Sequence, residues 1–177
     1  MKVICISGKA ESGKDSTGDI LAGNLSDCGK SVLVTHFADL LKYICKEYFD
    51  WNGDKDEFGR SLLQDVGSEI RKGNEDYWVE FISFILKSFG NKWEYVIIPD
   101  CRYPNEVSVL KKNEFNVMHV RVDRPNHESS LTEEQKMHIS ETAMDDVKPD
   151  IVISNDGTLI NLRDTVRTFI KEVLHEG

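Results

Sequence analysis

The sequence predicts an α/β fold in which a five-stranded parallel sheet is covered by helices on both faces. Three observations support this prediction. Short apolar runs alternate along the chain with segments of helical periodicity, the pattern of repeated β-α units. The runs are continuously apolar, as expected for strands that are buried on both faces. A length of 177 residues suits one domain with its own core, and we expect residues 1–177 to form a single domain.

The first half of the chain is expected to contain two strands and four helices. The first strand is the apolar run Val3–Ile6 with its flanks, and the glycines after it predict a turn into the first helix. Gly73 and Asn74 interrupt the helical pattern, and the polar residues 54–59 are expected to form a loop. The strands are placed at 2–7 and 31–37, and the helices at 14–26, 40–48, 60–72 and 75–89.

The second half is expected to contain three strands and two helices. One helix begins at Pro104, because proline suits the first position of a helix. The other follows the turn signal Asn155-Asp156-Gly157. The segment 125–149 is polar, apart from a short amphipathic piece at 131–137. The strands are placed at 95–99, 117–122 and 151–154.

Charge and composition exclude several classes of function. The net charge is -9, the pI is near 5 and no basic block is present, so binding to polymeric nucleic acid is not expected. No stretch is apolar and long enough to cross a membrane, and no leader sequence is apparent, which predicts a cytoplasmic protein. The four cysteines form no Cys-x-x-Cys pair. Reduced and mostly buried thiols are therefore expected, with disulfides or zinc as the alternative.

Ligands of a parallel α/β sheet bind outside the carboxyl ends of its strands. The residues that directly follow each predicted strand are therefore the first candidates for a functional site. They are Gly8–Ser16, Asp39, Asp100–Arg102, Asp123–Arg124 and Asn155–Asp156.

The turn after the first strand matches the G-x-x-x-x-G-K pattern of a phosphate-binding loop, or P-loop. Glycines let the backbone curl so that successive N–H groups point at one anion, and the following helix adds its positive N-terminal end. Lys14 is expected to reach the β- and γ-phosphates of ATP. The alternative is a glycine-rich turn without a ligand. The residues of the loop are Gly8, Lys9, Ala10, Glu11, Ser12, Gly13 and Lys14.

Asp15 departs from the usual pattern, which has a Ser or Thr at this position to bind Mg²⁺. A carboxylate can bind the same hard cation directly or through water, so we expect Asp15 to support Mg²⁺. An acidic residue in the first turn of a helix is also favoured by the helix dipole, and the two roles are compatible. Ser16 follows, and its hydroxyl can contact the α-phosphate.

With the loop Ser12-Gly13-Lys14-Asp15-Ser16, the sequence resembles the deoxynucleoside monophosphate kinase family of T-even phages and its bacterial relatives. The similarity extends in order over nearly the whole chain. It includes Phe37-Ala38-Asp39-Leu40-Leu41-Lys42, Leu63-Gln64-Asp65-Val66-Gly67, Tyr77-Trp78-Val79, Ile98-Pro99-Asp100-Cys101-Arg102, His119, Arg124-Pro125, His138-Ile139-Ser140-Glu141 and Ile153-Ser154-Asn155-Asp156-Gly157. The resemblance implies the three-layer P-loop NTPase fold of nucleoside monophosphate kinases, with strand order 2-3-1-4-5.

Animal phosphomevalonate kinases resemble the same skeleton, with a similar Gly-Lys-Asp loop and Asp-x-Arg motif. The skeleton therefore indicates phosphoryl transfer to a small phosphate ester more strongly than it identifies the acceptor. Asp100 ends a buried strand beside the P-loop, where it can hold a metal-bound water or accept hydrogen bonds from the acceptor. Arg102 can bind phosphate with its planar fork. The alternative for Asp100 is a cap on the helix that follows.

The resemblance implies that the acceptor binds to helices at about 38–90. Arg60 and Gln64 share a face of the third helix, and Arg71 lies three turns further on. A solvated charged face is the alternative for the arginines. Trp78 either stacks on a base or packs in the core, as its apolar neighbours favour. The candidate acceptor-binding residues are Asp39, Lys42, Arg60, Gln64, Arg71, Trp78 and Arg102.

The polar segment at about 124–149 is expected to act as a lid. Arg124 is the candidate for the arginine that contacts the transferring phosphate, with Arg121 as the alternative. Residues 125–147 contain no arginine, so either Arg102 and Arg124 carry the transition-state charge or a partner subunit of a homodimer contributes. Glu141 has no assigned role beyond holding the lid.

Asn155 resembles a residue of the loop that borders adenine in such kinases, and a simple turn is the alternative. The candidate catalytic residues are Lys14, Asp100, Arg102 and Arg124, and the candidate metal ligands are Asp15 and Asp100. The leading interpretation is a (deoxy)nucleoside monophosphate kinase that uses ATP and Mg²⁺ and acts on small molecules. The alternatives are a kinase for another phosphorylated metabolite, phosphomevalonate-like or dephospho-CoA-like, and a nucleotide-binding P-loop protein without catalytic activity.

Overall fold

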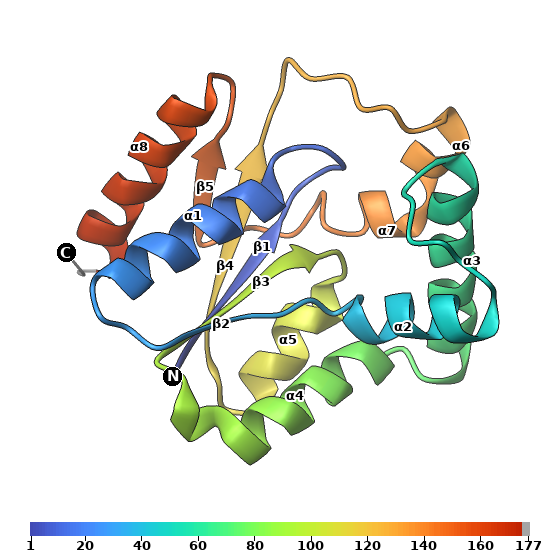
Figure 1. The fold of residues 1–177 in the computed structure, drawn as a ribbon, viewed down its shortest axis with the longest axis horizontal. Helices are drawn as coiled ribbons and strands as arrows, with labels where there is room; N and C mark the ends of the chain where they lie inside the picture. The colour runs from blue at the N-terminus through green and yellow to red at the C-terminus, as the bar shows by residue number, and fades with distance from the viewer. Residues whose placement is uncertain (175–177) are drawn as a thin grey trace.

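The structure, a computed structural model, describes residues 1–174 and contains one five-stranded sheet (Figure 1). All neighbouring strands are parallel, and their order is β2-β3-β1-β4-β5. The predicted parallel sheet and its strand order are therefore confirmed. The central strand β1 (Lys2–Ser7) pairs with β3 on one side and with β4 on the other. The P-loop thus leaves the sheet from its middle, between two further strand ends.

The helices form a layer on each face of the sheet, as Figure 1 shows. Successive side chains of a strand point to opposite faces, and β1 supplies both layers. Val3 and Cys5 pack on the side of helices α2, α4 and α5, whereas Ile4 and Ile6 pack on the side of α1 and α8. The helices are α1 (Lys14–Asp27), α2 (Asp39–Tyr48), α3 (Glu57–Gly73), α4 (Tyr77–Phe89), α5 (Pro104–Lys112), α6 (Glu133–Met137), α7 (Ile139–Thr142) and α8 (Leu159–Phe169).

The remaining elements are four strands and two short helical turns. They are β2 (Val32–Val34), β3 (Tyr95–Cys101), β4 (Asn116–Asp123), β5 (Ile151–Ser154), the 3₁₀ helix η1 (Gly90–Lys92) and the π-helical turn η2 (Ile170–Leu174). The second strand was predicted at 31–37, so it is one residue shorter at its start and three residues shorter at its end than expected. The backbone leaves the sheet after Thr35, because the N–H groups of Phe37 and Ala38 donate to the carboxylate of Asp100 instead of to a neighbouring strand.

Helix α3 begins three residues earlier than predicted, inside the segment expected to be a loop. Asp56 caps it, since its carboxylate accepts a hydrogen bond of 2.7 Å from the N–H of Gly59. The amphipathic piece at 131–137 forms α6 over Glu133–Met137, capped by Thr132. Helix α7 was not predicted, because a single turn is too short to show a periodic pattern.

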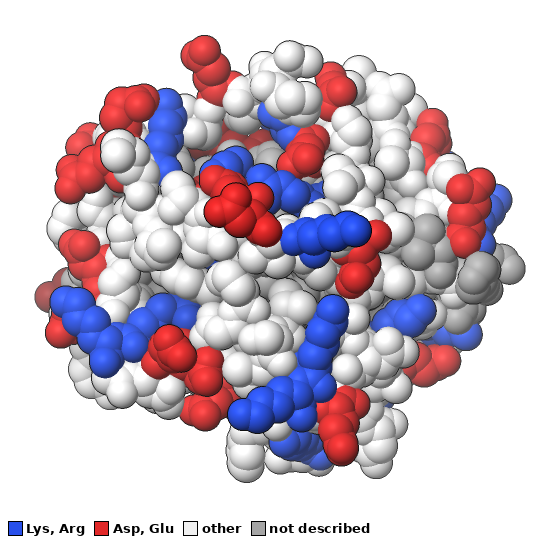
Figure 2. Space-filling view, turned by 180° about the vertical axis from the view of Figure 1, so that it is seen from behind, with Lys and Arg blue, Asp and Glu red and all other residues white. Residues whose placement is uncertain are grey.

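No helix within residues 1–174 is long and apolar enough to span a bilayer. The four cysteines are free thiols, and three of them are buried, as expected. On the face of the molecule that Figure 2 shows, acidic and basic side chains are intermingled, and side chains of both signs surround a hollow in the upper half.

Candidate active site

The P-loop has the curled backbone that its glycines predict. Gly8 and Gly13 have positive φ angles of 148° and 97°, a region that disfavours other residues. A Cβ atom at Gly8 would lie 2.4 Å from the carbonyl oxygen of Val122 in β4, so the loop also requires glycine for close approach. A Cβ atom at Gly13 would lie 2.4 Å from Nδ2 of Asn155. The loop is therefore packed tightly against the ends of two neighbouring strands.

Lys14 lies inside the curl of this loop. Its side chain is buried, and Nζ donates hydrogen bonds of 2.8 and 2.6 Å to the carbonyl oxygens of Gly8 and Lys9. Burial lowers the pKa of Lys14 to about 8, an effect that the nearby charge of Arg102 increases and that of Glu141 opposes. The ammonium group is thus held at the mouth of the loop, where an anionic ligand would stabilise its charge.

Two further features of the loop involve Ser12. The hydroxyl of Ser12 is buried and is the single buried side-chain polar atom within residues 1–174 that has no hydrogen-bond partner. An unsatisfied donor in a loop of this shape matches the need of a phosphate oxygen. Asn155 donates a 2.8 Å hydrogen bond from Nδ2 to the carbonyl oxygen of Ser12. The structure therefore places Asn155 against the loop itself, which braces the loop from the end of β5.

A cavity of about 480 Å³ opens beside the P-loop. Lys14 and Asp15 line it on the loop side, and one face of α3 lines the opposite side. The α3 residues recur at intervals of three or four, as one helix face requires. They are Arg60, Leu63, Gln64, Gly67, Ser68 and Arg71. The three α3 residues predicted from the sequence, Arg60, Gln64 and Arg71, therefore share this cavity.

Arg71 forms part of a rigid wall of the cavity. Its guanidinium lies 3.7 Å from the ring centre of Tyr103 and pairs with the carboxylate of Glu106 at 2.6 Å. Burial raises the pKa of Glu106 to about 7, although Arg71 and the N–H groups of Arg102 and Tyr103 act to lower it. Trp78 is almost fully buried in the core and also lines the cavity, so its packing in the core is confirmed and its stacking on a base stays a prediction.

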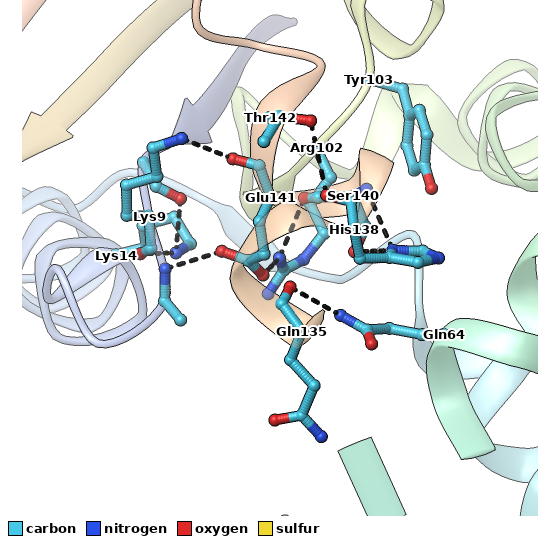
Figure 3. A network of polar contacts seen from close by, with 12 residues as sticks. Lys9, Lys14, Gln64, Arg102, Tyr103, Gln135, His138, Ser140, Glu141 and Thr142 are labelled. Carbon is cyan, nitrogen blue, oxygen red and sulfur yellow. Dashed lines mark hydrogen bonds and ion pairs between the residues drawn. The ribbon is translucent and has the colours of Figure 1, made fainter. Parts of the chain in front are cut away.

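Asp100 and Arg102 lie at the end of β3, on the floor of the cavity. The two oxygens of Asp100 accept hydrogen bonds of 2.9 and 3.0 Å from the N–H groups of Phe37 and Ala38. Asp100 therefore binds the backbone just before α2 and does not cap the following helix α5, as the alternative supposed. Each oxygen keeps a second lone pair for a metal-bound water. Arg102 points toward the P-loop and pairs with Glu141 (Figure 3).

Asp15 and the residues after β2 form a cluster of charges on the other side of the loop. Nε2 of His36 lies 3.8 Å from Oδ1 of Asp15, and Nδ1 of His36 lies 3.3 Å from Oδ2 of Asp39. The contact with His36 lowers the pKa of Asp15, and that with Asp15 raises the pKa of His36. Lys42 lines the cavity, but Asp39 does not, because its carboxylate binds Lys42 and His36.

The lid segment, residues 124–149, crosses over the P-loop and rests on α3 (Figure 1). The side-chain nitrogen of Gln64 lies 3.4 Å from the carbonyl oxygen of Gln135, and Ser68 contacts His138 at 3.2 Å. Between the lid segment, the P-loop and the ends of β4 and β5 lies a second cavity of about 930 Å³. The lid segment therefore borders both cavities, on either side of the P-loop.

The two arginines considered for the transferring phosphate have different surroundings. Arg121 uses all three of its side-chain nitrogens to bind Asp123, the carbonyl oxygen of Met144 and Asp145, so it holds the base of the lid segment. Arg124 lines the second cavity, and Nη1 lies 3.3 Å from the carbonyl oxygen of Glu11 in the P-loop. Arg124 is therefore better placed than Arg121 to contact a phosphate group bound at the P-loop.

Contacts at two places hold the lid segment to the P-loop. Near its start, Ser130 and His127 bind the carboxylate of Glu11, which also pairs with Arg60 at 3.1 Å. Near its end, Lys9 binds the carbonyl oxygen of Glu141 at 2.8 Å, and the N–H of Ala10 donates to the carboxylate of Glu141 at 2.9 Å. Glu11 thus joins the P-loop, the lid segment and α3.

The Glu11 contacts predict a pH-dependent contribution to stability. Hydrogen bonds from Ser130 lower the pKa of Glu11 from 4.5 to about 2. A lowered folded-state pKa means that the contribution is complete above pH 4.5 and is lost as the pH falls toward 2. We expect Glu11→Gln to lower Tm by about 2–4 °C at pH 7, equivalent to about 1 kcal/mol for a partly exposed network. Calorimetry should show the same difference at pH 7 and 5 and a smaller one at pH 4 and 3; a difference that stays constant down to pH 3 would contradict this assignment.

Sequence reasoning missed several residues that line the first cavity. His36 was missed because β2 was predicted to extend beyond it, and the candidate residues after the third strand ended at Arg102, one position before Tyr103. Glu106 carries a recognisable signal, since it stands at the third position of a helix that starts with Pro104. Glu141 gave no signal of its contacts, because its partners lie 131 and 39 positions away in the chain.

Comparison with known proteins adds a family match. A family model described as deoxynucleotide monophosphate kinase matches residues 48–166, which leaves the P-loop outside the matched region. The chain is 31% identical over 115 residues to the deoxynucleotide monophosphate kinase of Enterobacteria phage T4, covering 63% of this chain and 45% of the relative. The corresponding protein of Escherichia phage RB69 is 26% identical over 115 residues, with 63% and 44% covered. The chain thus spans about half the length of these relatives.

Solved structures of APS kinases and shikimate kinases have the same fold. The APS kinase CysC of Mycobacterium tuberculosis, solved with AMPPNP and APS, superposes with a TM-score of 0.55 at 13% identity, covering 97% of this chain and 98% of the other. The shikimate kinase of Aquifex aeolicus superposes with a TM-score of 0.53 at 15% identity over 100% of both chains. At such identities the similarity establishes the fold, which is that of P-loop kinases.

Proposed function

Because the chain belongs to the deoxynucleotide monophosphate kinase family, we propose that it transfers the γ-phosphoryl group of ATP to a (deoxy)nucleoside monophosphate, giving the diphosphate. One observation carries most weight for this proposal. The P-loop residues Lys14 and Asp15 line the same cavity as the basic face of α3 and Arg102. A phosphate held by the loop would therefore meet an acceptor phosphate held by Arg60 and Arg102, without any intervening wall.

The proposed chemistry is positioning and charge neutralisation, the main requirements of phosphoryl transfer. The P-loop N–H groups, the Ser12 hydroxyl and Lys14 bind the phosphates of ATP. Arg60 and Gln64 on α3 orient the acceptor, and the wall of Trp78 and Tyr103 offers an apolar surface for its base. Arg71 fixes that wall by stacking on Tyr103.

Charge on the transferring group is neutralised from two sides in this proposal. Arg102 approaches from the acceptor side, and Arg124 from the second cavity, where the donor nucleotide would extend past Asn155. The lid segment covers the reacting groups and excludes water, as lids of kinases do. A cytoplasmic location suits the proposed substrates, and a homodimer stays a prediction.

Mg²⁺ belongs to the same proposal. Asp15 would hold it, directly or through water, with Asp100 as an outer partner. No group of three or more potential metal ligands occurs within residues 1–174, so the proposal rests on Asp15 beside the P-loop, where contact with His36 lowers the pKa of its carboxyl. When bound there, the ion would offset the negative charge of the transferring phosphates.

A coupled assay of ADP release tests the function directly. The panel contains the deoxy and ribo forms of the common nucleoside monophosphates, together with phosphomevalonate and dephospho-CoA. We expect turnover with at least one nucleoside monophosphate and none with the other two. Turnover with phosphomevalonate or dephospho-CoA alone would identify one of the alternative kinases. A thermal shift with ATP but no turnover with any acceptor would indicate a nucleotide-binding protein instead.

The role of Asp15 predicts a graded response to substitution. Asp15→Ser restores the usual P-loop hydroxyl and should remain active, whereas Asp15→Lys places a cation at the metal position and should be inactive. Asp15→Ala should need roughly tenfold more Mg²⁺ for half-maximal rate, since one charged ligand is lost. Titrating MgCl₂ at constant ATP measures this requirement. If Asp15→Ala and the parent protein gave the same Mg²⁺ dependence, Asp15 would act only on the helix dipole.

A further inference from the structure

The carboxylate of Glu141 connects the lid segment with two parts of the candidate active site. Its side chain is 6% exposed. One oxygen accepts the N–H of Ala10 in the P-loop at 2.9 Å, and the other pairs with Nη1 of Arg102. Figure 3 shows this carboxylate between the P-loop and the guanidinium. Glu141 is thus a nearly buried charge whose two oxygens each have a defined partner.

The charges around Glu141 explain why a carboxylate occupies this place. Lys14 and Arg102 both point into the same cavity, and the charge of Arg102 acts to lower the pKa of Lys14. The negative charge of Glu141 opposes that effect and also raises the pKa of Arg102 against the effect of burial. Two cations can therefore stand close together at neutral pH because this carboxylate offsets their repulsion.

The contact with Glu141 also determines the orientation of the Arg102 guanidinium. Nη1 donates to Glu141 and, at 3.1 Å, to the carbonyl oxygen of Ser140, so both bonds come from one short stretch of α7. Nε and Nη2 have no hydrogen-bond partner among residues 1–174. An arginine side chain is flexible, and anchoring one end of its planar fork leaves the other donors in a fixed direction toward the cavity.

We propose that Glu141 is a positioning residue for the reaction, which holds Arg102 in the orientation that stabilises the transferring phosphate once the lid segment lies over the P-loop. This inference rests on the proposed kinase function and deepens it. The lid segment has no arginine between residues 125 and 147, and in this proposal it instead orients Arg102, the residue that directly follows β3.

The selective test is Glu141→Gln. The glutamine oxygen can still accept the N–H of Ala10, but the ion pair with Arg102 is lost. We expect kcat to fall about 10- to 100-fold, the usual cost of a misoriented catalytic group. The KM for ATP should change less than about twofold, because the P-loop contacts are kept. In an Arg102→Lys background, Glu141→Gln should lower kcat less than about threefold further, because a residue that acts through Arg102 loses its effect with it.

Glu134→Gln provides the matched control, since it removes the same charge from an exposed position of the lid segment and should behave as the parent protein. Thermal unfolding and the stoichiometry of nucleotide binding establish that each variant is folded. The positioning role would be overturned if Glu141→Gln lowered kcat by the same factor in the parent and in the Arg102→Lys background. It would also be overturned if Glu141→Gln changed only Tm or only the KM for ATP. A parent protein that turns over no monophosphate would overturn the proposed function as well, so the two failures are distinguishable.

Discussion

Replacing Lys14 by alanine is expected to abolish phosphoryl transfer while leaving the protein folded. Lys14 is the one lysine inside the curl of the P-loop, and its ammonium group contacts the carbonyl oxygens of Gly8 and Lys9. In the proposed reaction it neutralises charge that grows on the phosphates in the transition state. Removal of one such preorganised donor typically costs about 10²–10³-fold in kcat, and we expect at least that loss here.

The fold should survive this change because the partners of Lys14 are loop carbonyls at the edge of a cavity, which water can reach once the side chain is shortened. Steady-state kinetics with saturating monophosphate gives the loss in kcat, and circular dichroism and Tm report the fold. Lys72→Ala is the matched control, since Lys72 is exposed on α3, lines neither cavity and pairs with Glu69. Turnover of Lys14→Ala within threefold of the parent protein would contradict the P-loop assignment.

The second large effect is expected from the two arginines on the acceptor side. Replacing an arginine by lysine keeps the charge but removes the paired geometry of the planar fork. Arg60→Lys should mainly raise the KM for the monophosphate, by roughly tenfold for one charge-assisted hydrogen bond. Arg102→Lys should also lower kcat, by roughly 10²-fold, since an interaction that strengthens in the transition state appears in kcat.

Varying each substrate in turn separates the two sites. Neither replacement should change the KM for ATP more than about twofold, because the P-loop controls that constant. Arg60 also pairs with Glu11 of the P-loop, so Glu11→Gln serves as the control for effects transmitted through that contact. If these variants raised the KM for ATP and left the KM for the monophosphate unchanged, the donor and acceptor sides would be reversed. If neither variant changed kcat or either KM, the acceptor-binding site would lie elsewhere.

The parts of the site that could be predicted from the sequence are those built from residues close together in the chain. The P-loop is one turn between a strand and a helix, and its glycines and Lys14 follow from local backbone geometry. The cavity face of α3 follows from helical spacing, which places Arg60, Gln64 and Arg71 on one side. The resemblance to a kinase family supplied the strand order, which spacing alone does not determine.

The prediction for the second strand failed because a distant segment takes its hydrogen bonds. The strand was predicted to extend to Phe37, but Asp100 binds the N–H groups of Phe37 and Ala38, 63 and 62 positions away, and β2 ends early. The carboxylate of Asp39 was expected in the cavity and instead binds His36 and Lys42, each three positions away. These partners are local, but helical spacing alone does not show which of the neighbouring side chains will pair.

The sequence by itself determined the layered α/β fold, the phosphate loop and the basic face that opposes it, because short-range periodicity and backbone geometry specify these features. Only the tertiary structure decided which charged side chains pair with one another between these elements. The carboxylates of Glu11 and Glu141 find their partners between 39 and 131 positions away, and the buried charge of Glu106 finds Arg71 at 35. Such pairs form because buried or crowded charges need compensation, and the compensating group depends on which strand ends the fold brings together.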